Sequence, residues 1–212
     1  MIPSDAPTRH DFVWLGPSWR EGLLAGLREE ALVARWVGDG HPLIVARSQP
    51  GDAPGALRLG LATPDKRRIA LYIERDAIVR HAPPPLLADL PVPPSWRPTV
   101  GGVSALGHPA RVYGSLAWAG MTGLDYVRPD RSDLDLLFTP ADAAALQGLL
   151  AGLRPLAVRA QPRLDGEILL PGGRAVAWRE WLGGGQVLVK AADQVYLAES
   201  AALEREMWGM AA

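Results

Sequence analysis

Two aspartates, Asp133 and Asp135, lie one residue apart at the start of the apolar run "DLDLLF". In a β-strand, residues i and i+2 point to the same face, so these two carboxylates project together, roughly 7 Å apart along the chain. Two like charges on one face repel each other unless a positive charge lies between them. A divalent cation meets this need, and Mg²⁺ favours carboxylate oxygens together with substrate phosphates. The pair therefore predicts a metal-dependent site for phosphoryl or nucleotidyl transfer.

A Gly-Ser pair precedes these aspartates in the chain. Gly114 permits a close approach of the backbone, and Ser115 can cap a helix predicted for "SLAWAGMTG". The free N–H groups at such a helix start form an anion site. Each motif alone has a simpler explanation, a solvated pair of acids or a plain helix cap. A phosphate cradle and a metal-binding pair in one strand–helix–strand unit favour a nucleotidyltransferase.

In the segment "RLDGEILL", Asp165 and Glu167 share one face of a predicted strand and could supply a third carboxylate. Such a group could bind the metal or take the proton from an attacking hydroxyl. Asp165 is the preferred third catalytic and metal-binding residue, and Glu167 is the alternative for that role. Glu167 is also predicted to contribute to substrate binding. The alternative is that either residue flanks the following turn in solvent.

Two cationic side chains complete the candidate site. Only two of the 22 basic residues are lysine, and one of them, Lys190, ends the predicted strand "QVLVK". Its ammonium group is a compact charge suited to a polyphosphate, although an exposed strand-end lysine is an equally good explanation. Arg179, in "AWREWL", is predicted to bind substrate or to pair internally with Glu180.

The elements that position these residues predict an α+β domain with a mixed sheet. A short strand over residues 111–113 leads into the helix after Gly114, and "DLDLLF" forms the next strand. A second helix is predicted to begin with Thr139 as its N-cap and Pro140 in its first turn, and to continue to about Leu153. Strands are then predicted for "LAVRAQ", "RLDGEILL", "RAVAWREWL", "QVLVKA" and "VYLA", with a hairpin turn at "PGG", before a final helix in "ESAALEREMWGM".

The chain is predicted to have two parts joined by a linker. Residues 1–85 form a smaller N-terminal α/β part that binds substrate or partner, with a helix in "REGLLAGLREEALVARWV" and strands over residues 41–49, 57–64 and 67–75. Residues 86–98 are proline-rich and are expected to be an extended, polyproline-like linker. Residues 99–212 form the mixed-sheet nucleotidyltransferase core.

Composition excludes several functional classes. A net charge of −1 over 212 residues argues against a nucleic-acid-binding protein. The absence of cysteine excludes disulfides, thiolate nucleophiles and cysteine-based zinc sites, and it is compatible with a reducing cytoplasm. No signal peptide is visible, and no apolar stretch approaches the length of a membrane-spanning helix. We therefore expect a cytoplasmic protein that does not bind membranes.

The motif "YGS…SDLDLLF" resembles the signature of the DNA polymerase β-type nucleotidyltransferase superfamily. A closer resemblance extends over "YGSLAWAGMTGLDYV…SDLDLLF", "DGEILLPGGRAVAWREW" and "VLVK". These segments resemble the malonate decarboxylase holo-[acyl-carrier-protein] synthases, a family also called phosphoribosyl-dephospho-CoA transferases. The N-terminal segments "RHDFVWL", "HPLIVAR" and "LGLATP" fit the same family, so the resemblance covers nearly the whole chain.

The resemblance implies a specific reaction. The family transfers a 2′-(5″-phosphoribosyl)-3′-dephospho-CoA group from its triphosphate precursor, triphosphoribosyl-dephospho-CoA, to a serine of the apo acyl-carrier subunit of malonate decarboxylase, and pyrophosphate is released. Asp133 and Asp135 match the family's catalytic aspartates, with Mg²⁺ as the expected cofactor. Two alternatives remain open: a nucleotidyltransferase that adenylylates a protein or small molecule from ATP, and a non-catalytic assembly module.

Overall fold

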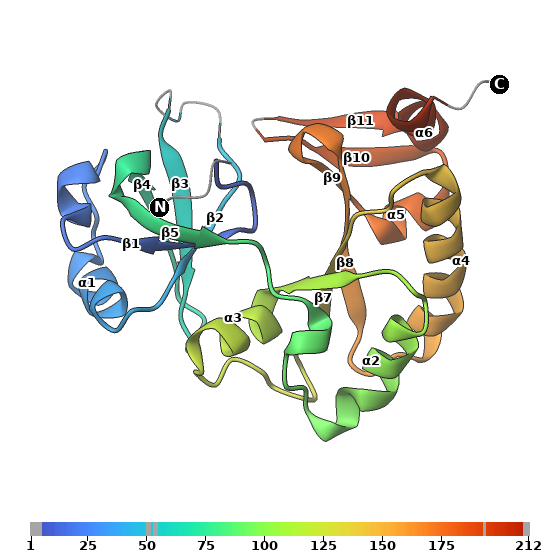
Figure 1. The fold of residues 1–212 in the computed structure, drawn as a ribbon, viewed down its shortest axis with the longest axis horizontal. Helices are drawn as coiled ribbons and strands as arrows, with labels where there is room; N and C mark the ends of the chain where they lie inside the picture. Colours follow the sequence, from blue (N-terminus) through green and yellow to red (C-terminus); the bar gives the residue numbers. More distant parts are fainter. Residues whose placement is uncertain (1–5, 50–51, 53–54, 193, 210–212) are drawn as a thin grey trace. The chain divides into compact units, whose positions relative to one another are not determined.

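The structure, a computed structural model, describes residues 6–49, 52, 55–192 and 194–209 (Figure 1). The chain divides into two compact units. Unit 1 comprises Met1–Pro84 and Met121–Tyr126, and unit 2 comprises Pro85–Gly120 and Val127–Ala212. No helix in the described ranges is long and apolar enough to cross a membrane.

Unit 1 is built on a five-stranded antiparallel sheet with the strand order β4-β3-β2-β1-β5. Burial alternates along β3, where Leu57, Leu59 and Leu61 are buried, so one face of the sheet packs into a core. Helix α1 (Glu30–Gly38) contributes Val33 and Trp36 to the buried residues. The strands are β1 (Phe12–Leu15), β2 (Leu43–Val45), β3 (Leu57–Ala62), β4 (Arg68–Ile73) and β5 (Ile78–Ala82).

The helix predicted for residues 20–37 forms only over its second half. A 3₁₀ turn covers Trp19–Gly22, and α1 begins at Glu30. Leu23, predicted to lie on the apolar face of that helix, instead makes a β-bridge to Ile73. The glycines within "REGLLAGL" lower helix propensity, so the bridge prevails over the helical spacing of the leucines. Strands β1 and β5 were not predicted.

Unit 2 contains a six-stranded mixed sheet with the order β11-β10-β9-β8-β7-β6, which confirms the predicted α+β fold class. Within the described strands only β7 and β8 run parallel. A parallel pair needs a crossover, and helix α4 (Ala143–Arg159) supplies it. The strands are β6 (Ala110–Tyr113), β7 (Leu134–Phe138), β8 (Leu164–Leu170), β9 (Arg174–Ala177), β10 (Gln186–Lys190) and β11 (Val195–Glu199).

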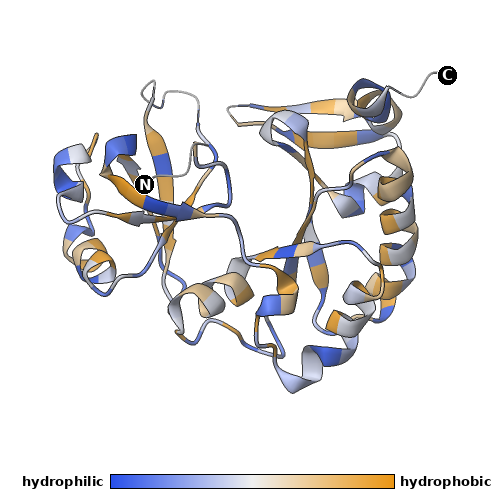
Figure 2. Cartoon of the chain, in the orientation of Figure 1, coloured by the Kyte–Doolittle hydropathy of each residue, from blue (hydrophilic) through white to orange (hydrophobic). Residues whose placement is uncertain are grey.

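The helices of unit 2 complete its apolar core. Figure 2 colours α4 with both apolar and polar residues, as expected of a helix with one buried face. Its buried residues include Leu146, Leu149 and Leu153, and the strand residues Leu136 and Ile168 are fully buried. The remaining helices are α2 (Arg97–Ser104), α3 (Gly114–Thr122), α5 (Trp178–Gly183) and α6 (Ser200–Trp208).

Three predictions of secondary structure in unit 2 are wrong. Asp142, and not Thr139, is the N-cap of α4, because its side chain accepts a hydrogen bond from the Ala145 backbone N–H at 2.7 Å. The segment 156–161, predicted as a strand, is mostly the last turn of α4, in which Leu156 is buried. The predicted strand "RAVAWREWL" ends at Ala177, where α5 begins.

Residues 86–98 do not form an extended polyproline segment. They contain two 3₁₀ turns, Leu87–Asp89 and Pro94–Trp96, and belong to unit 2. Leu87 and Trp96 are buried, and the Trp96 indole N–H donates to the Pro129 carbonyl at 3.1 Å. The burial of these two large apolar side chains outweighs the extended preference of the prolines around them.

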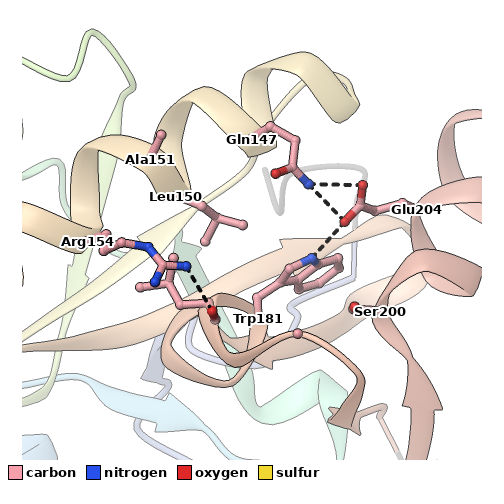
Figure 3. Close-up of a pocket in the computed structure, with 9 residues that line it drawn as sticks. Gln147, Leu150, Ala151, Arg154, Trp181, Ser200 and Glu204 are labelled. Atoms are coloured by element: carbon pink, nitrogen blue, oxygen red, sulfur yellow. Dashed lines mark hydrogen bonds between the residues drawn. The ribbon is translucent and has the colours of Figure 1, made fainter.

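A groove of about 350 Å³ lies along helices α4, α5 and α6 (Figure 3). Four of the side chains that line it, those of Gln147, Arg154, Trp181 and Glu204, make hydrogen bonds to other protein groups. The Glu204 carboxylate accepts hydrogen bonds from the Gln147 amide at 3.1 Å and from the Trp181 indole N–H at 2.9 Å. Arg154 donates to the Leu182 carbonyl at 3.0 Å. These contacts tie α6 to α4 and α5, so the groove has a structural role.

Glu204→Ala is expected to lower the free energy of unfolding by about 1 to 2 kcal/mol, because the buried Trp181 indole N–H loses its acceptor. Urea unfolding followed by tryptophan fluorescence measures the change. Glu206→Ala is the matched control on the same helix. Its exposed ion pair with Arg174 predicts a loss below about 1 kcal/mol. Equal losses of unfolding free energy in the two variants would contradict the stabilising role given to the hydrogen bond between Glu204 and Trp181.

Candidate active site

The register between β7 and β8 brings the predicted acidic residues together. Asp135 lies directly opposite Asp165 in this parallel pair. Asp133 immediately precedes β7, and the hydrogen bond from the Leu134 N–H to the Arg163 carbonyl, at 2.9 Å, continues the pairing by one residue. Leu134 is fully buried, so the residues on either side of it project to the opposite face of the sheet. Asp133, Asp135 and Asp165 thus share one face.

The electrostatics of Asp135 reflect this crowding. Burial, and then the negative charges of Asp133 and Asp165, together raise the pKa of Asp135 to about 6, although the charge of Arg163 acts to lower it. Three carboxylates with one guanidinium give a formal charge of −2 when all are ionised. The cluster therefore has a surplus of negative charge and of oxygen donors.

Arg163 is a site residue that the sequence analysis missed. Its Nη1 lies 3.1 Å from Asp133 Oδ2, and its Nη2 lies 3.6 Å from Asp165 Oδ2. One guanidinium therefore bridges two carboxylates from neighbouring strands. The position of Arg163 two residues before Asp165 could have indicated a shared face, but its pairing with Asp133 depends on the strand register.

The Gly-Ser turn lies beside the acidic cluster. Tyr113, at the end of β6, pairs with Asp135, and the chain then turns at Gly114 into α3. Gly114 has a φ of +65°, and a Cβ atom at this position would collide with the Asp135 carboxylate. Ser115 lies in the first turn of α3. The first N–H groups of this helix therefore begin next to Asp135, in a position suited to an anion.

Glu167 and Lys190 form a separate ion pair further along the sheet. Glu167 lies two residues after Asp165 on β8 and is 3% exposed, and its Oε1 lies 2.8 Å from Lys190 Nζ. Lys190 is at the end of β10, with its side chain about one third exposed. The buried carboxylate fixes the ammonium group, whose remaining donors can serve a ligand.

Arg179 is held by backbone contacts. Its Nε and Nη2 donate to the Leu164 carbonyl at 3.2 and 2.6 Å, and its guanidinium stacks on the Trp178 ring at 4.5 Å. Leu164 immediately precedes Asp165. These contacts favour a positioning role for Arg179, in which it fixes the start of β8.

The donor set fits a divalent cation that also carries substrate phosphates. In the part of the chain that the structure describes, no group of three histidine, cysteine or acidic side chains is arranged as a ready metal cage. Mg²⁺ is commonly held by one or two carboxylates, with phosphates and water as the other ligands. Asp133 and Asp135, with their surplus charge, match that kind of site.

Metal-free protein is expected to lose stability as the pH rises from about 4 to about 6. In this window the folded state keeps a proton on Asp135, while the unfolded chain, with a pKa near 3.8, has released it. The unfolded state binds fewer protons, so the free energy of unfolding falls with pH, by up to about 3 kcal/mol from this group.

Urea unfolding in the presence of a chelator, at several pH values between 4 and 7, measures this loss. Asp135→Asn removes the titrating group, and the other carboxylates titrate in both proteins. The difference between wild type and variant therefore isolates Asp135. Parallel pH profiles for the two proteins would show that the Asp135 carboxylate is not perturbed.

The chain is similar to known proteins over nearly all of its length. The C-terminal domain of phosphoribosyl-dephospho-CoA transferase MdcG matches residues 86–201, and the N-terminal domain matches residues 8–84. A phosphoribosyl-dephospho-CoA transferase of Bradyrhizobium diazoefficiens is 41% identical over 206 residues, which cover 91% of this chain and 90% of the relative. A protein of the same name from Xanthomonas campestris is 38% identical over 208 residues, covering 92% and 95%.

No solved structure matches the chain. The family matches include both the Gly-Ser turn and the two acid-bearing strands, and they extend through unit 1. They confirm the resemblance noted in the sequence: the chain belongs to the phosphoribosyl-dephospho-CoA transferase family.

Proposed function

We propose that the protein is a nucleotidyltransferase that attaches the prosthetic group of malonate decarboxylase. It would move 2′-(5″-phosphoribosyl)-3′-dephospho-CoA from triphosphoribosyl-dephospho-CoA to a serine of the apo acyl-carrier subunit, in the cytoplasm. The observation that carries the proposal is the pairing of Asp135 with Asp165 beside the turn at Gly114. Carboxylates next to a helix N-terminus provide both halves of a polyphosphate site.

In this proposal the three aspartates have different tasks. Asp133 and Asp135 would hold Mg²⁺, which would neutralise phosphate charge and lower the pKa of the attacking hydroxyl. Asp165 is a third metal ligand and accepts the proton of the carrier serine. The serine oxygen forms a bond to the α-phosphorus as the bond from that phosphorus to the bridging oxygen breaks. Pyrophosphate carries away the electron pair of the broken bond, and a phosphodiester remains on the carrier.

The leaving group is proposed to bind where donors and positive charge are available. The N–H groups at the start of α3 and the Ser115 hydroxyl would hold the β- and γ-phosphates. Lys190, fixed by the buried carboxylate of Glu167, would add an ammonium group on the same sheet. Arg179 would act indirectly by holding the start of β8. Positioning and charge neutralisation would then supply most of the catalysis.

Unit 1 is proposed to bind the bulky CoA-derived substrate or the carrier protein. It holds none of the carboxylates assigned to chemistry, and the N-terminal family match covers most of it. Its independent antiparallel sheet provides a second surface without interrupting the catalytic sheet.

The test is a direct measurement of group transfer. The protein is incubated with Mg²⁺, triphosphoribosyl-dephospho-CoA and the apo carrier, and the carrier is weighed by intact-protein mass spectrometry. A mass increase equal to the prosthetic group is expected, and it should be absent without metal and in Asp133→Ala. A parallel incubation with ATP distinguishes adenylylation. Transfer from ATP alone, or no transfer from an authentic precursor, would refute the proposed substrate.

A further inference from the structure

Arg163 occupies a position where its charge conflicts with the metal site of the proposed function. It lies opposite Asp133, and its two terminal nitrogens reach Asp133 and Asp165 at 3.1 and 3.6 Å. A guanidinium is always ionised and cannot be removed from the cluster by deprotonation. A cation bound to the same carboxylate oxygens would therefore face a fixed positive charge at close range.

The side chain of Arg163 is free to move in response. It is 60% exposed, and each carboxylate that it contacts is more than one third exposed. Ion pairs of this kind contribute little to stability, so breaking them is cheap. The backbone carbonyl of Arg163 is held by Leu134, which keeps the Cα atom in place while the side chain turns.

When the cation displaces the Arg163 guanidinium from the carboxylates, the phosphates of the substrate offer it a new partner. The planar fork of arginine binds phosphate oxygens with two parallel hydrogen bonds, which a lysine ammonium cannot reproduce. In the proposed reaction the cation arrives with a triphosphate, which brings such oxygens to the carboxylates that Arg163 leaves. After the exchange the carboxylates face the cation and the guanidinium faces the phosphates, so opposite charges stay adjacent.

We propose that Arg163 is a resident counter-ion of the acidic cluster, which yields Asp133 and Asp165 to a divalent cation and then binds the substrate's phosphates. This inference rests on the proposed function, since it takes the metal site from it. In this inference the Arg163 side chain changes its partners from the two carboxylates to the substrate's phosphates. The guanidinium competes with the cation when the substrate is absent and assists binding when the substrate is present.

The first arm of the test measures metal affinity without substrate. Mn²⁺ is titrated into the full-length protein, and free Mn²⁺ is followed by electron paramagnetic resonance. Arg163→Ala is expected to bind Mn²⁺ about three- to tenfold more tightly than wild type, because a competing charge is gone. Arg163→Lys keeps the charge and should bind close to wild type. Arg159→Ala, at an exposed arginine near the end of α4, is the control.

The second arm measures phosphate binding. Inorganic triphosphate is titrated into the Mn²⁺-loaded proteins by calorimetry. Both Arg163→Ala and Arg163→Lys are expected to bind it about fivefold or more weakly, because neither offers the bidentate fork. Arg159→Ala should match wild type. Circular dichroism confirms that the variants are folded.

The outcomes separate the inference from the proposed function. Unchanged or weaker Mn²⁺ binding by Arg163→Ala would overturn the counter-ion role, and unchanged triphosphate binding would overturn the phosphate role. Asp135→Asn reports on the proposed function itself. If that variant binds Mn²⁺ as tightly as wild type, the cluster is not the metal site and both ideas fail. If only the Arg163 variants behave as wild type, the inference alone fails.

Discussion

Asp135→Asn is expected to lower the rate of group transfer by about a thousandfold or more while raising the stability of the metal-free protein. The loss of activity follows from the central position of Asp135, between Asp133, Asp165 and the turn at Gly114. The gain in stability comes from removing the charge of this carboxylate. At neutral pH, an ionised Asp135 is half-buried and is repelled by two neighbouring carboxylates. An amide of the same shape avoids that cost of about 1 to 3 kcal/mol.

Two measurements on one preparation check this prediction. Transfer is followed by the mass of the carrier, and unfolding in urea is followed at pH 7 with a chelator. Asp130→Asn makes the same chemical change at an exposed position upstream and should alter neither quantity. A variant that loses activity and stability together would indicate that Asp135 supports the fold. That result would remove the argument for a metal-binding role.

Gly114→Ala is expected to reduce activity about a hundredfold or more, because the new Cβ atom would collide with the Asp135 carboxylate. Either the carboxylate turns away or the start of α3 shifts, and both changes separate the proposed metal ligand from the proposed phosphate site. The positive φ of Gly114 adds a backbone cost of about 1 kcal/mol to the folded state.

Gly123→Ala separates these two effects. Gly123 has a φ of +72°, but a Cβ atom there would meet nothing within 4 Å. This variant should lose a similar amount of stability, about 1 kcal/mol, and keep its activity. Steady-state kinetics and urea unfolding of both variants decide the question. Equal activities for the two would show that the close approach at Gly114 is not needed for catalysis.

The acidic cluster was largely predictable because its pattern is local. Leu134 lies between Asp133 and Asp135 and places both aspartates on one face of their strand. In the paired strand, Asp165 lies on the same face and Gly166 on the opposite face. Gly166 also shows what the pattern leaves out. A Cβ atom there would collide with the Leu136 carbonyl, so close contact between β7 and β8 requires glycine. That contact becomes visible only once the two strands are paired.

The parts of the fold that sequence patterns did not predict depend on tertiary contacts. The leucines of residues 20–27 have helical spacing, yet Leu23 pairs with β4 and helix α1 begins only at Glu30. The buried side chain of Trp96 anchors a proline-rich segment to unit 2. Arg163 likewise meets one of its two partners, Asp133, from thirty residues earlier in the chain. In each case the deciding partner is remote in sequence, and local propensity carries no information about it.

The parallel pairing of β7 with β8 has a consequence for how the protein folds. Asp135 and Asp165 become neighbours only after the intervening chain has formed α4 and crossed back over the sheet. A contact between residues this far apart has a larger loop-closure entropy cost than a hairpin, so it tends to form late. The repulsion between the carboxylates is then met only when most of the apolar core is already in place. A chain in which β7 and β8 are not yet paired therefore lacks the crowded carboxylates and their electrostatic cost.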